Sequence, residues 1–456
     1  MNALILSAVS GVIMMFSGFT LKENKSVVRL LAMFLLAAII IANILELRGI
    51  HFFSIDLKGM LQFDRFAILF TLVSSLCTFI FFLLSSRDME KVGKDYSEFF
   101  ALIFFILTGI ALVSAFKSLL TLFLGIEIIS IPLYVLTGSD KRNLKSNEAS
   151  LKYFLMGTFS TGLMLMGIAL VYGATGTFNI TNMQTGNSSV LFMAGLMMLL
   201  FSMSFKVSAA PFHFWTPDVY DGAPTVFTSF MATIVKAASF VAFMRLFEEA
   251  FGSIQPQWKL LVGIITAVTL FIGNITAVFQ QSVKRMLAYS SIAQAGFMML
   301  AVYSINSDAR EGLILYAAAY SLATIGIFSV LIKMNDYTFE GFNGFAKQEP
   351  VIAATVVIFL LSLAGIPLTA GFLSKFYMLR ATIANGGSLW LVIFAVLMAA
   401  VSVYYYFRLI QAMYFKQGES QAVGITPGFK FTLVSVAAIT IVLGLFPNLL
   451  TYWLYF

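Results

Sequence analysis

Four ionisable side chains lie deep inside long apolar stretches of the chain: Glu127, Lys206, Lys236 and Lys375. An isolated charge at the centre of a lipid bilayer costs about 2.5–3.5 kcal/mol on insertion scales, so four such residues in one chain point to a function. A buried lysine without a partner tends to lose its proton, and a lysine poised between its charged and neutral forms can accept and release protons near neutral pH. We therefore expect the three lysines to relay protons, with Glu127 setting the charge of the nearest one.

A purely structural role is the alternative for these residues. A buried ion pair between Glu127 and one lysine would fix the packing of two helices. That interpretation leaves two of the three lysines without a carboxylate, so the relay explains the pattern better.

Two prolines interrupt apolar stretches close to these lysines. Pro211 lies in KVSAAPFHFW, five residues after Lys206, and Pro367 lies in SLAGIPLTAGFLSKF, before Lys375. A proline removes one helix hydrogen bond and frees a carbonyl, which lipid tolerates only where protein or water satisfies the exposed backbone. A simple kink is the common alternative, but broken helices also mark the ion paths of transporters. The pairing of each proline with a lysine predicts a polar cavity at each break.

Weaker candidates for the pathway are His213, Ser290, Ser291 and Gln294. His213 follows the first predicted break, where a lone histidine is commonly interfacial. The other three share one apolar segment and could hold bridging waters, although most hydroxyls in membrane helices bond their own backbone. With one cysteine and two histidines in the chain, we expect no metal site.

The elements that position these residues are predicted to be membrane-spanning helices. The chain is 60% hydrophobic and 11% charged, whereas a soluble domain carries about 25% charged residues. The apolar runs are long and do not alternate, which indicates helices rather than strands. The sequence thus predicts an all-α, polytopic membrane protein. Its fourteen expected spans are 2–20, 27–47, 66–86, 97–113, 115–137, 151–173, 189–213, 224–248, 259–280, 286–304, 312–334, 350–380, 387–413 and 429–449.

The order of the spans suggests a single membrane domain, 1–456, that contains an internal repeat. The predicted broken segments, the seventh and the twelfth, are five spans apart, and an odd separation places them in opposite orientations. We therefore expect two inverted five-helix repeats, the fourth to eighth and the ninth to thirteenth segments. The predicted parts are 1–96 with the first three helices, 97–248 and 259–413 with the two repeats, and 429–449 with the last helix.

The distribution of basic residues predicts the orientation. Lysine and arginine are more frequent in the odd-numbered connections, such as that holding Lys141 and Arg142, than in the even-numbered ones. The positive-inside rule then places the odd connections in the cytoplasm and both termini outside, in the periplasm. The basic residues are scattered over short connections and form no patch, so a nucleic-acid partner is not expected.

Four stretches resemble the signatures of a known family. GIEIISIPLYVL, FKVSAAPFHFWTPDVYDGAPT, KRMLAYSSIAQAGFMML and LAGIPLTAGFLSKFYML are similar, in this order, to motifs of the antiporter-like membrane subunits of respiratory complex I, the NADH:quinone oxidoreductase. The resemblance covers about residues 60–415. Within the family the chain is most similar to the smallest subunit type, because no long lateral helix follows the last span and Lys375 stands where another type has a glutamate.

The resemblance implies a function in proton translocation. It implies that Glu127 pairs with Lys206, and that protons move outward from the cytoplasm through Lys206, Lys236 and Lys375, driven by quinone reduction elsewhere. No cofactor is expected on this chain; NADH, FMN, iron–sulfur clusters and quinone are expected in other subunits. The expected partners are neighbouring K-type and M-type membrane subunits and the lipid of a bacterial inner membrane.

Three alternatives to this function remain open at the level of sequence. A subunit of a multisubunit cation/proton antiporter would show sodium-dependent transport without a response to NADH. A membrane hydrogenase subunit would have a hydrogenase large subunit among its neighbouring genes. A non-pumping structural subunit would keep NADH-driven pumping after Lys206 or Glu127 is neutralised.

Overall fold

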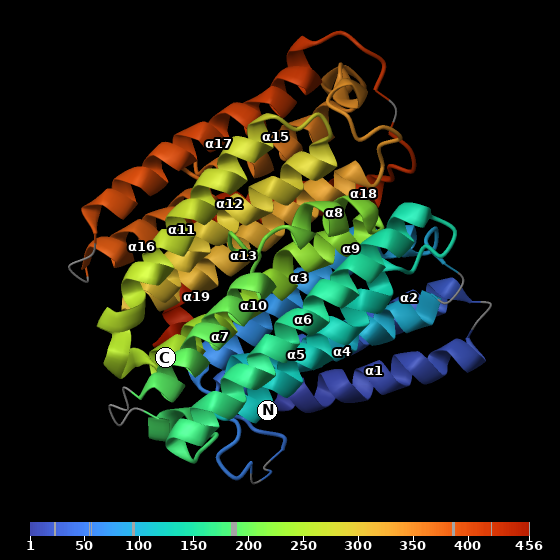
Figure 1. Ribbon diagram of the computed structural model, residues 1–456. Coiled ribbons are helices and arrows are strands. Elements are labelled where there is room, and N and C mark those ends of the chain that lie inside the picture. Colours follow the sequence, from blue (N-terminus) through green and yellow to red (C-terminus); the bar gives the residue numbers. More distant parts are fainter. Residues whose placement is uncertain are drawn as a thin grey trace.

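The structure is a computed structural model that describes residues 1–21, 24–53, 55, 57–93, 96–183, 189–384, 388–420 and 422–455. Within these ranges the regular secondary structure is helical, with only isolated β-bridges between connecting segments. The helices run roughly alongside one another in one bundle (Figure 1). The predicted all-α class is therefore confirmed.

Twelve stretches of the described chain are long and apolar enough to cross a membrane. They are α1 (Asn2–Thr20), α2 (Lys25–Leu47), α3 (Arg65–Met89), α4 (Tyr96–Ala115), α5 (Leu119–Thr137), α6 (Leu144–Thr175), the continuous stretch Thr225–Glu249, the stretch Gly252–Val278 that contains α11 (Gln255–Val278), α12 (Val283–Ser304), α13 (Ser307–Leu331), α17 (Leu389–Phe415) and α18 (Pro427–Leu445). The stretch Thr225–Glu249 consists of α9 (Thr225–Phe230), a π-helical turn (Met231–Val235) and α10 (Lys236–Glu249).

The two remaining predicted spans are the broken ones. The seventh span consists of α7 (Val190–Lys206) and, after a break, α8 (Trp215–Gly222). The twelfth consists of α15 (Pro350–Ala364) and α16 (Ala370–Ala384). With these two, the structure accounts for all fourteen predicted spans. Two short helices, α14 (Phe345–Gln348) and α19 (Asn448–Thr451), complete the numbering.

The breaks begin earlier than the prolines that predicted them. Helix α7 ends at Lys206, and Ser208 has a left-handed backbone with φ of 63°. Helix α15 ends at Ala364, and Gly365 at φ 83° caps it. A left-handed residue closes a helix by turning its N–H groups back onto the last carbonyls. The prolines therefore follow the helix ends rather than cause them.

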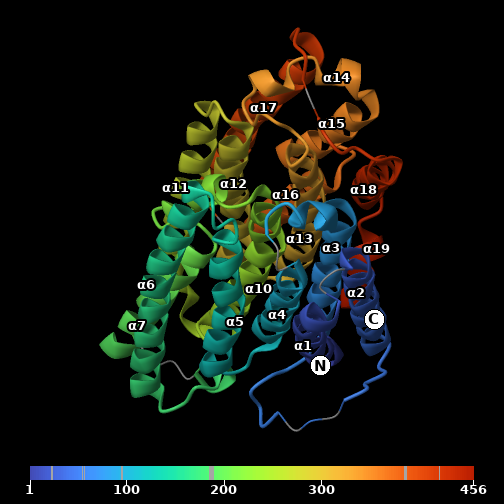
Figure 2. The same cartoon turned by 90° about the vertical axis from the view of Figure 1, so that its right-hand side faces the viewer.

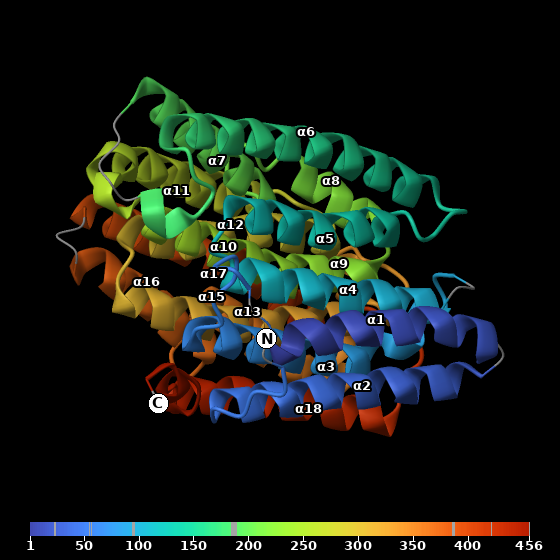
Figure 3. The same ribbon diagram turned by 90° about the horizontal axis from the view of Figure 1, so that it is seen from below.

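Burial divides the bundle into an interior and a rim. The stretch Thr225–Glu249 and helices α12 and α13 are buried over almost their whole length, whereas only about a third of α2 and of α18 is buried within this single chain. Figures 2 and 3 show α10, α12 and α13 in the interior, with α2 and α18 at one edge. Close packing of α11 on α12 relies on Gly273, where a Cβ would lie 2.5 Å from the backbone nitrogen of Ala293.

Both termini lie at the same end of the bundle (Figures 1 and 2). An even number of spans requires this arrangement. The division into two inverted repeats, and the domain boundaries drawn from it, stay predictions.

Candidate functional site

The first part of the site joins α5 to the end of α7. Glu127, Ser130 and Tyr134 occupy positions i, i+3 and i+7 of α5 and so share one helix face. The ammonium group of Lys206, the last residue of α7, donates a hydrogen bond to Ser130 Oγ at 2.9 Å. Among the described residues, no ion pair joins Lys206 to Glu127, and Glu127 Oε1 is buried without a hydrogen-bond partner. The hydroxyl of Ser130 thus occupies the position at Lys206 where the resemblance implies a carboxylate.

The break between α7 and α8 is rich in polar atoms that lack partners. In the described chain the buried hydroxyls of Ser204, Ser208 and Thr216 and the Nδ1 atom of His213 make no hydrogen bond. The hydroxyl of Thr269, on α11, accepts a bond of 2.9 Å from the backbone N–H of Ala210. A buried polar group without a partner costs about 1–3 kcal/mol, so this cluster is a natural place for bound water. The polar cavity predicted beside the first break stays a prediction.

Lys236 follows a π-helical turn, a feature that is frequent at functional sites. Its side chain is 2% exposed, and the ammonium group donates to Ser291 Oγ at 3.0 Å and to the Ser291 carbonyl at 3.2 Å. It also lies 5.5 Å from the ring centroid of Tyr220. Within the described part of the chain it has no carboxylate partner.

Lys375 extends from α16 back to the end of α15. Its ammonium group donates to the carbonyls of Leu363 at 2.7 Å and Ala364 at 3.2 Å, and it lies 4.6 Å from the ring centroid of Phe297. The carboxyl end of a helix carries partial negative charge, which suits a cation. Gly365 is required here, because a Cβ would approach the Cδ atom of Lys375 to 2.9 Å.

A small cavity lies next to Lys375. It has a volume of about 10 Å³ and is lined in part by Lys375, Ser362, Ser374 and Gln294. That volume is close to the least that one water molecule needs. The polar lining fits the cavity predicted beside the second break.

Helix α12 connects Lys236 to Lys375. Ser291 contacts Lys236, while the Gln294 amide donates to the Leu363 carbonyl at 2.9 Å and to the Tyr406 hydroxyl at 3.1 Å. The hydroxyls of Ser290 and Tyr406 are hydrogen-bonded to each other. The Tyr316 hydroxyl, on α13, donates to the Gln294 carbonyl oxygen. Three residues that the sequence marked as weaker candidates therefore lie between Lys236 and Lys375. Among the described residues, no hydrogen bond joins Ser291 to Ser290 or Gln294.

Two tyrosines of this network were missed at the level of sequence. Tyr406 and Tyr316 stand in apolar segments, where a tyrosine is as commonly a packing residue as a hydrogen-bond partner. The only sign of them in the sequence is a hydroxyl group inside a predicted span. Which groups these hydroxyls bond to depends on which helices become neighbours.

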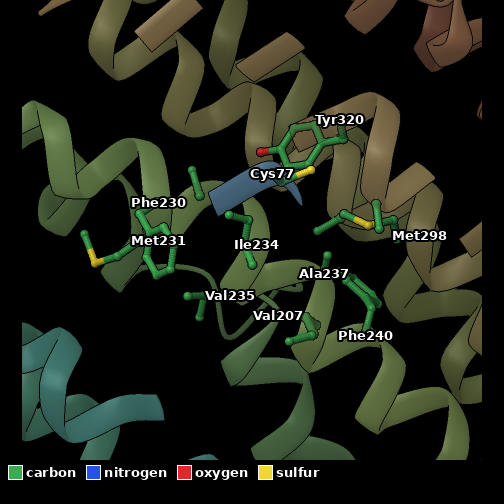
Figure 4. Close-up of a cluster of buried hydrophobic side chains, with 14 of the residues drawn as sticks. Cys77, Val207, Phe230, Met231, Ile234, Val235, Ala237, Phe240, Met298 and Tyr320 are labelled. Atoms are coloured by element: carbon green, nitrogen blue, oxygen red, sulfur yellow. The ribbon is translucent and has the colours of Figure 1, made fainter. Parts of the chain in front are cut away.

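Among the described residues, Lys206 and Lys236 share no hydrogen-bond partner. Lys206 bonds to Ser130 and Lys236 to Ser291, on different helices. Figure 4 shows that Val207, which follows Lys206, and Ile234 and Ala237, which flank Lys236, belong to one buried apolar cluster. The site therefore has two separate polar parts.

Three further basic residues, near helix ends, are buried. Lys284 is 4% exposed and donates to the carbonyls of Asp221 and Ala223, both at 2.8 Å, at the end of α8. Lys333 forms an ion pair with Asp88 at 2.6 Å, and Arg245 contacts Asp64 at 2.6 Å and Glu249. Sequence hydropathy does not reveal this burial, because near a helix end it cannot distinguish a solvated connection from one covered by neighbouring helices.

No metal cluster is apparent in the described ranges: they contain no group of three or more histidine, cysteine, aspartate and glutamate side chains placed to hold a metal ion.

Known proteins resemble this chain over its whole length. Residues 117–402 match the family model of the NADH:quinone oxidoreductase/Mrp antiporter transmembrane region. The chain is 39% identical to NADH-quinone oxidoreductase subunit N of Cytophaga hutchinsonii, with 99% of this chain and 98% of that protein covered. It is 31% identical to a chain of respiratory complex I from Thermus thermophilus, with a TM-score of 0.85 over 99% of this chain and 98% of that one.

A second solved structure is also similar. A chain of the membrane-bound sulfane sulfur reductase, an archaeal respiratory membrane complex, is 25% identical, with a TM-score of 0.88 over 100% of this chain and 96% of that one. The two similar structures come from complexes with different names, so the fold is common to more than one respiratory assembly. The match of the family model and the full-length identity show that this chain belongs to the antiporter-like membrane subunits of respiratory complex I, with NADH-quinone oxidoreductase subunit N as its relatives.

Proposed function

We propose that this chain translocates protons across a bacterial inner membrane as part of an NADH:quinone oxidoreductase. It assembles with the other membrane subunits of the complex. The redox cofactors and the quinone are held by those other subunits, so this chain contributes transport rather than electron transfer. The proton moves outward from the cytoplasm through Glu127, Lys206, Lys236 and Lys375.

One observation carries the proposal: Lys236 and Lys375 contact neutral groups rather than carboxylates. Lys236 bonds to the hydroxyl and carbonyl of Ser291, and Lys375 bonds to two backbone carbonyls. A buried ion pair would hold a lysine in its charged form. With neutral partners, no counter-charge holds either lysine in its charged form, as a relay requires.

The two polar parts divide the pathway into two stages. In the first, Glu127 and Lys206 exchange charge around Ser130, close to the unpartnered polar atoms of the α7–α8 break. In the second, a proton on Lys236 reaches Lys375 along the hydroxyl and amide groups of α12 and Tyr406. Transfer between the stages requires water or a side-chain movement at the apolar cluster around Val207 and Ile234.

Energy for outward transport has to come from outside this chain. Moving one charge against the membrane potential costs about 2.3 kcal/mol per 100 mV. The redox reaction in the other subunits supplies this energy, and it acts here by changing the charge balance between Glu127 and Lys206.

The test replaces Lys236 by glutamine in the purified complex, reconstituted in sealed vesicles. Loss of a proton carrier slows the transfer step by about 10²–10⁴-fold, so protons pumped per NADH oxidised should fall while the complex still assembles. Lys152→Gln is the matched control, because Lys152 also lies in a predicted span but is ion-paired with Glu148 and Asp218 near the surface. Normal pumping by an assembled Lys236→Gln complex would support a structural role instead.

A further inference from the structure

A groove opens at the rim of the bundle between α2, α3 and the start of α18. Its volume is about 370 Å³, and Figure 3 shows α2 and α18 at the edge where it lies. It lies at the end of the bundle where α2 and α18 begin and α3 ends, and where the predicted orientation places the cytoplasm. The groove shares no residue with the lysine network.

One part of the groove is strongly basic. Arg29, Arg87 and Lys333 line it. Arg29 contacts Glu90 at 3.4 Å and Lys333 is paired with Asp88. Arg87 is exposed and makes no ion pair with another residue of the described chain.

The two carboxylates at the groove do not neutralise its cations. Lys25 also approaches Glu90 at 4.0 Å, and Lys91 also contacts Asp88 at 3.0 Å. Each carboxylate is thus shared by two cations, and Arg87 is additional. This part of the groove therefore retains positive charge that a bound anion would balance.

The other part of the groove is apolar and faces outward. Leu30 is 65% exposed and Leu83 is 42% exposed, and Phe429 completes the wall. Gly428 also lines the groove, and a Cβ there would meet no atom within 4 Å, so a larger side chain has room at this position. Positive charge at the helix ends and apolar surface further along the same helices match a molecule with an anionic head and hydrocarbon chains.

We propose that this groove binds an anionic phospholipid. The phosphate lies between Arg29 and Arg87, because guanidinium groups bond phosphate oxygens in pairs. The acyl chains lie along Leu30, Leu83 and Phe429. A soluble anion would use only the basic part and leave the apolar wall uncovered, so the lipid fits both parts of the groove better.

The test uses a phosphatidylglycerol probe with a photoreactive acyl chain. The purified, intact complex is reconstituted in phosphatidylcholine vesicles with a trace of this probe, illuminated and digested. We expect label on peptides that contain residues 26–34 or 427–434. Unlabelled phosphatidylglycerol should compete, whereas phosphatidylcholine and inorganic phosphate should not.

Variants connect the label to the groove. Each cation near the membrane surface strengthens the binding of an anionic lipid about fivefold. The double variant Arg29→Gln/Arg87→Gln should therefore reduce labelling about 25-fold. Lys347→Gln with Lys416→Gln is the control, because both lysines are exposed at the same end of the bundle but outside the groove. If the arginine variant fails to assemble, Gly428→Leu fills the groove instead and should also abolish labelling.

Several results would overturn the proposal. Equal labelling by a phosphatidylcholine probe would show that only the acyl chains are recognised, and displacement by inorganic phosphate would indicate a soluble anion. Unchanged labelling in the assembled variants, or no labelling of the intact complex because a partner subunit covers the groove, would also exclude it.

Discussion

Neutral groups, rather than carboxylates, face the three lysines of the proposed pathway. Lys206 contacts the hydroxyl of Ser130 and Lys236 that of Ser291, while Lys375 contacts backbone carbonyls. A hydroxyl donates one hydrogen bond and accepts others, so it can take a proton on one side and release one on the other. At the scale of single residues, the site is suited to passing a proton on rather than holding it.

The hydroxyl of Tyr406 provides a test of this route. It joins Ser290 to Gln294 in the second stage, and the change Tyr406→Phe removes it with little loss of volume. Unsatisfied buried partners cost about 1–3 kcal/mol, so we expect NADH-driven pumping to slow about tenfold or more. Initial rates of proton uptake into vesicles measure the effect.

Tyr404→Phe is the matched control for this change, since Tyr404 lies on the same helix and is 61% exposed. Pumping should be normal in the control. If Tyr406→Phe also pumps normally, the proton takes a route that avoids this hydroxyl.

The lysines could be predicted from the sequence, but their contacts could not. A charged residue within an apolar span is rare, so Lys236 and Lys375 can be recognised from the sequence alone. A serine or tyrosine in a helix is common, and whether it bonds its own backbone or a neighbouring helix depends on the packing. The Ser291 hydroxyl makes both kinds of bond: it accepts from Lys236 on a neighbouring helix and donates to the Ala288 carbonyl of its own helix at 2.7 Å.

At the scale of elements, the two broken helices are held by close backbone contacts. Gly371, near the start of α16, lies so near α15 that a Cβ would come within 1.9 Å of the Ser362 carbonyl oxygen. That contact fixes the second half of the broken helix against the first and thereby places Lys375 at the Leu363 carbonyl.

The change Gly371→Ala should therefore disturb the break. Overpacking of this kind costs about 1–3 kcal/mol, so the variant complex should lose this subunit at a lower temperature than the wild type. Gly162→Ala is the control, because a Cβ on Gly162 meets nothing within 4 Å and alanine favours a helix. Both variant complexes are heated, and native electrophoresis then measures how much of this subunit each complex retains. Equal retention would mean that α15 and α16 separate readily.

The buried pair of Asp88 and Lys333 connects the end of α3 to the segment after α13. The change Asp88→Asn leaves the ammonium group of Lys333 without its counter-charge, and breaking a buried pair in this way costs about 3–5 kcal/mol. We expect reduced assembly of the complex, measured by the amount of this chain in purified membranes.

A partly exposed pair serves as the control. Lys430 and Glu349 are more exposed than Asp88 and Lys333, so Glu349→Gln should change stability by no more than about 1 kcal/mol. A similar loss of assembled chain in both variants would show that burial of the Asp88–Lys333 pair does not increase its contribution to stability.

The sequence predicted all twelve stretches of the described chain that are long and apolar enough to cross a membrane, because about 20 apolar residues are a strong signal. It was less accurate at the breaks. Proline marked both regions, but the helices end at residues with left-handed backbone, and Ser208 is not a residue type that announces such a conformation. The π-helical turn before Lys236 was also not predictable, because MATIV is an ordinary apolar run.

At the scale of the whole molecule, the direction of the chain through the membrane decides the direction of transport. The termini lie at one end of the bundle, and the distribution of basic residues predicts that this end lies outside. Cys77, the sole cysteine of the chain, is buried and should not react with polar reagents.

Single-cysteine labelling tests this orientation. Lys141→Cys lies in an odd-numbered connection and Arg48→Cys in an even-numbered one, and both positions are exposed. In intact cells a membrane-impermeant maleimide should label Arg48→Cys alone, and after the cells are opened it should label both. The opposite pattern in intact cells would reverse the orientation and with it the proposed direction of proton movement.

The carbonyl of Leu363 has a consequence for the last step. A carbonyl oxygen offers two lone pairs, and the Lys375 ammonium and the Gln294 amide take one each. An arriving water molecule finds this acceptor fully occupied and must displace one of the two donors. If the amide swings away first, the lysine keeps its anchor while a solvent molecule binds in the vacated position. In the proposed pathway, Gln294 would then control the access of single water molecules to the group that releases the proton.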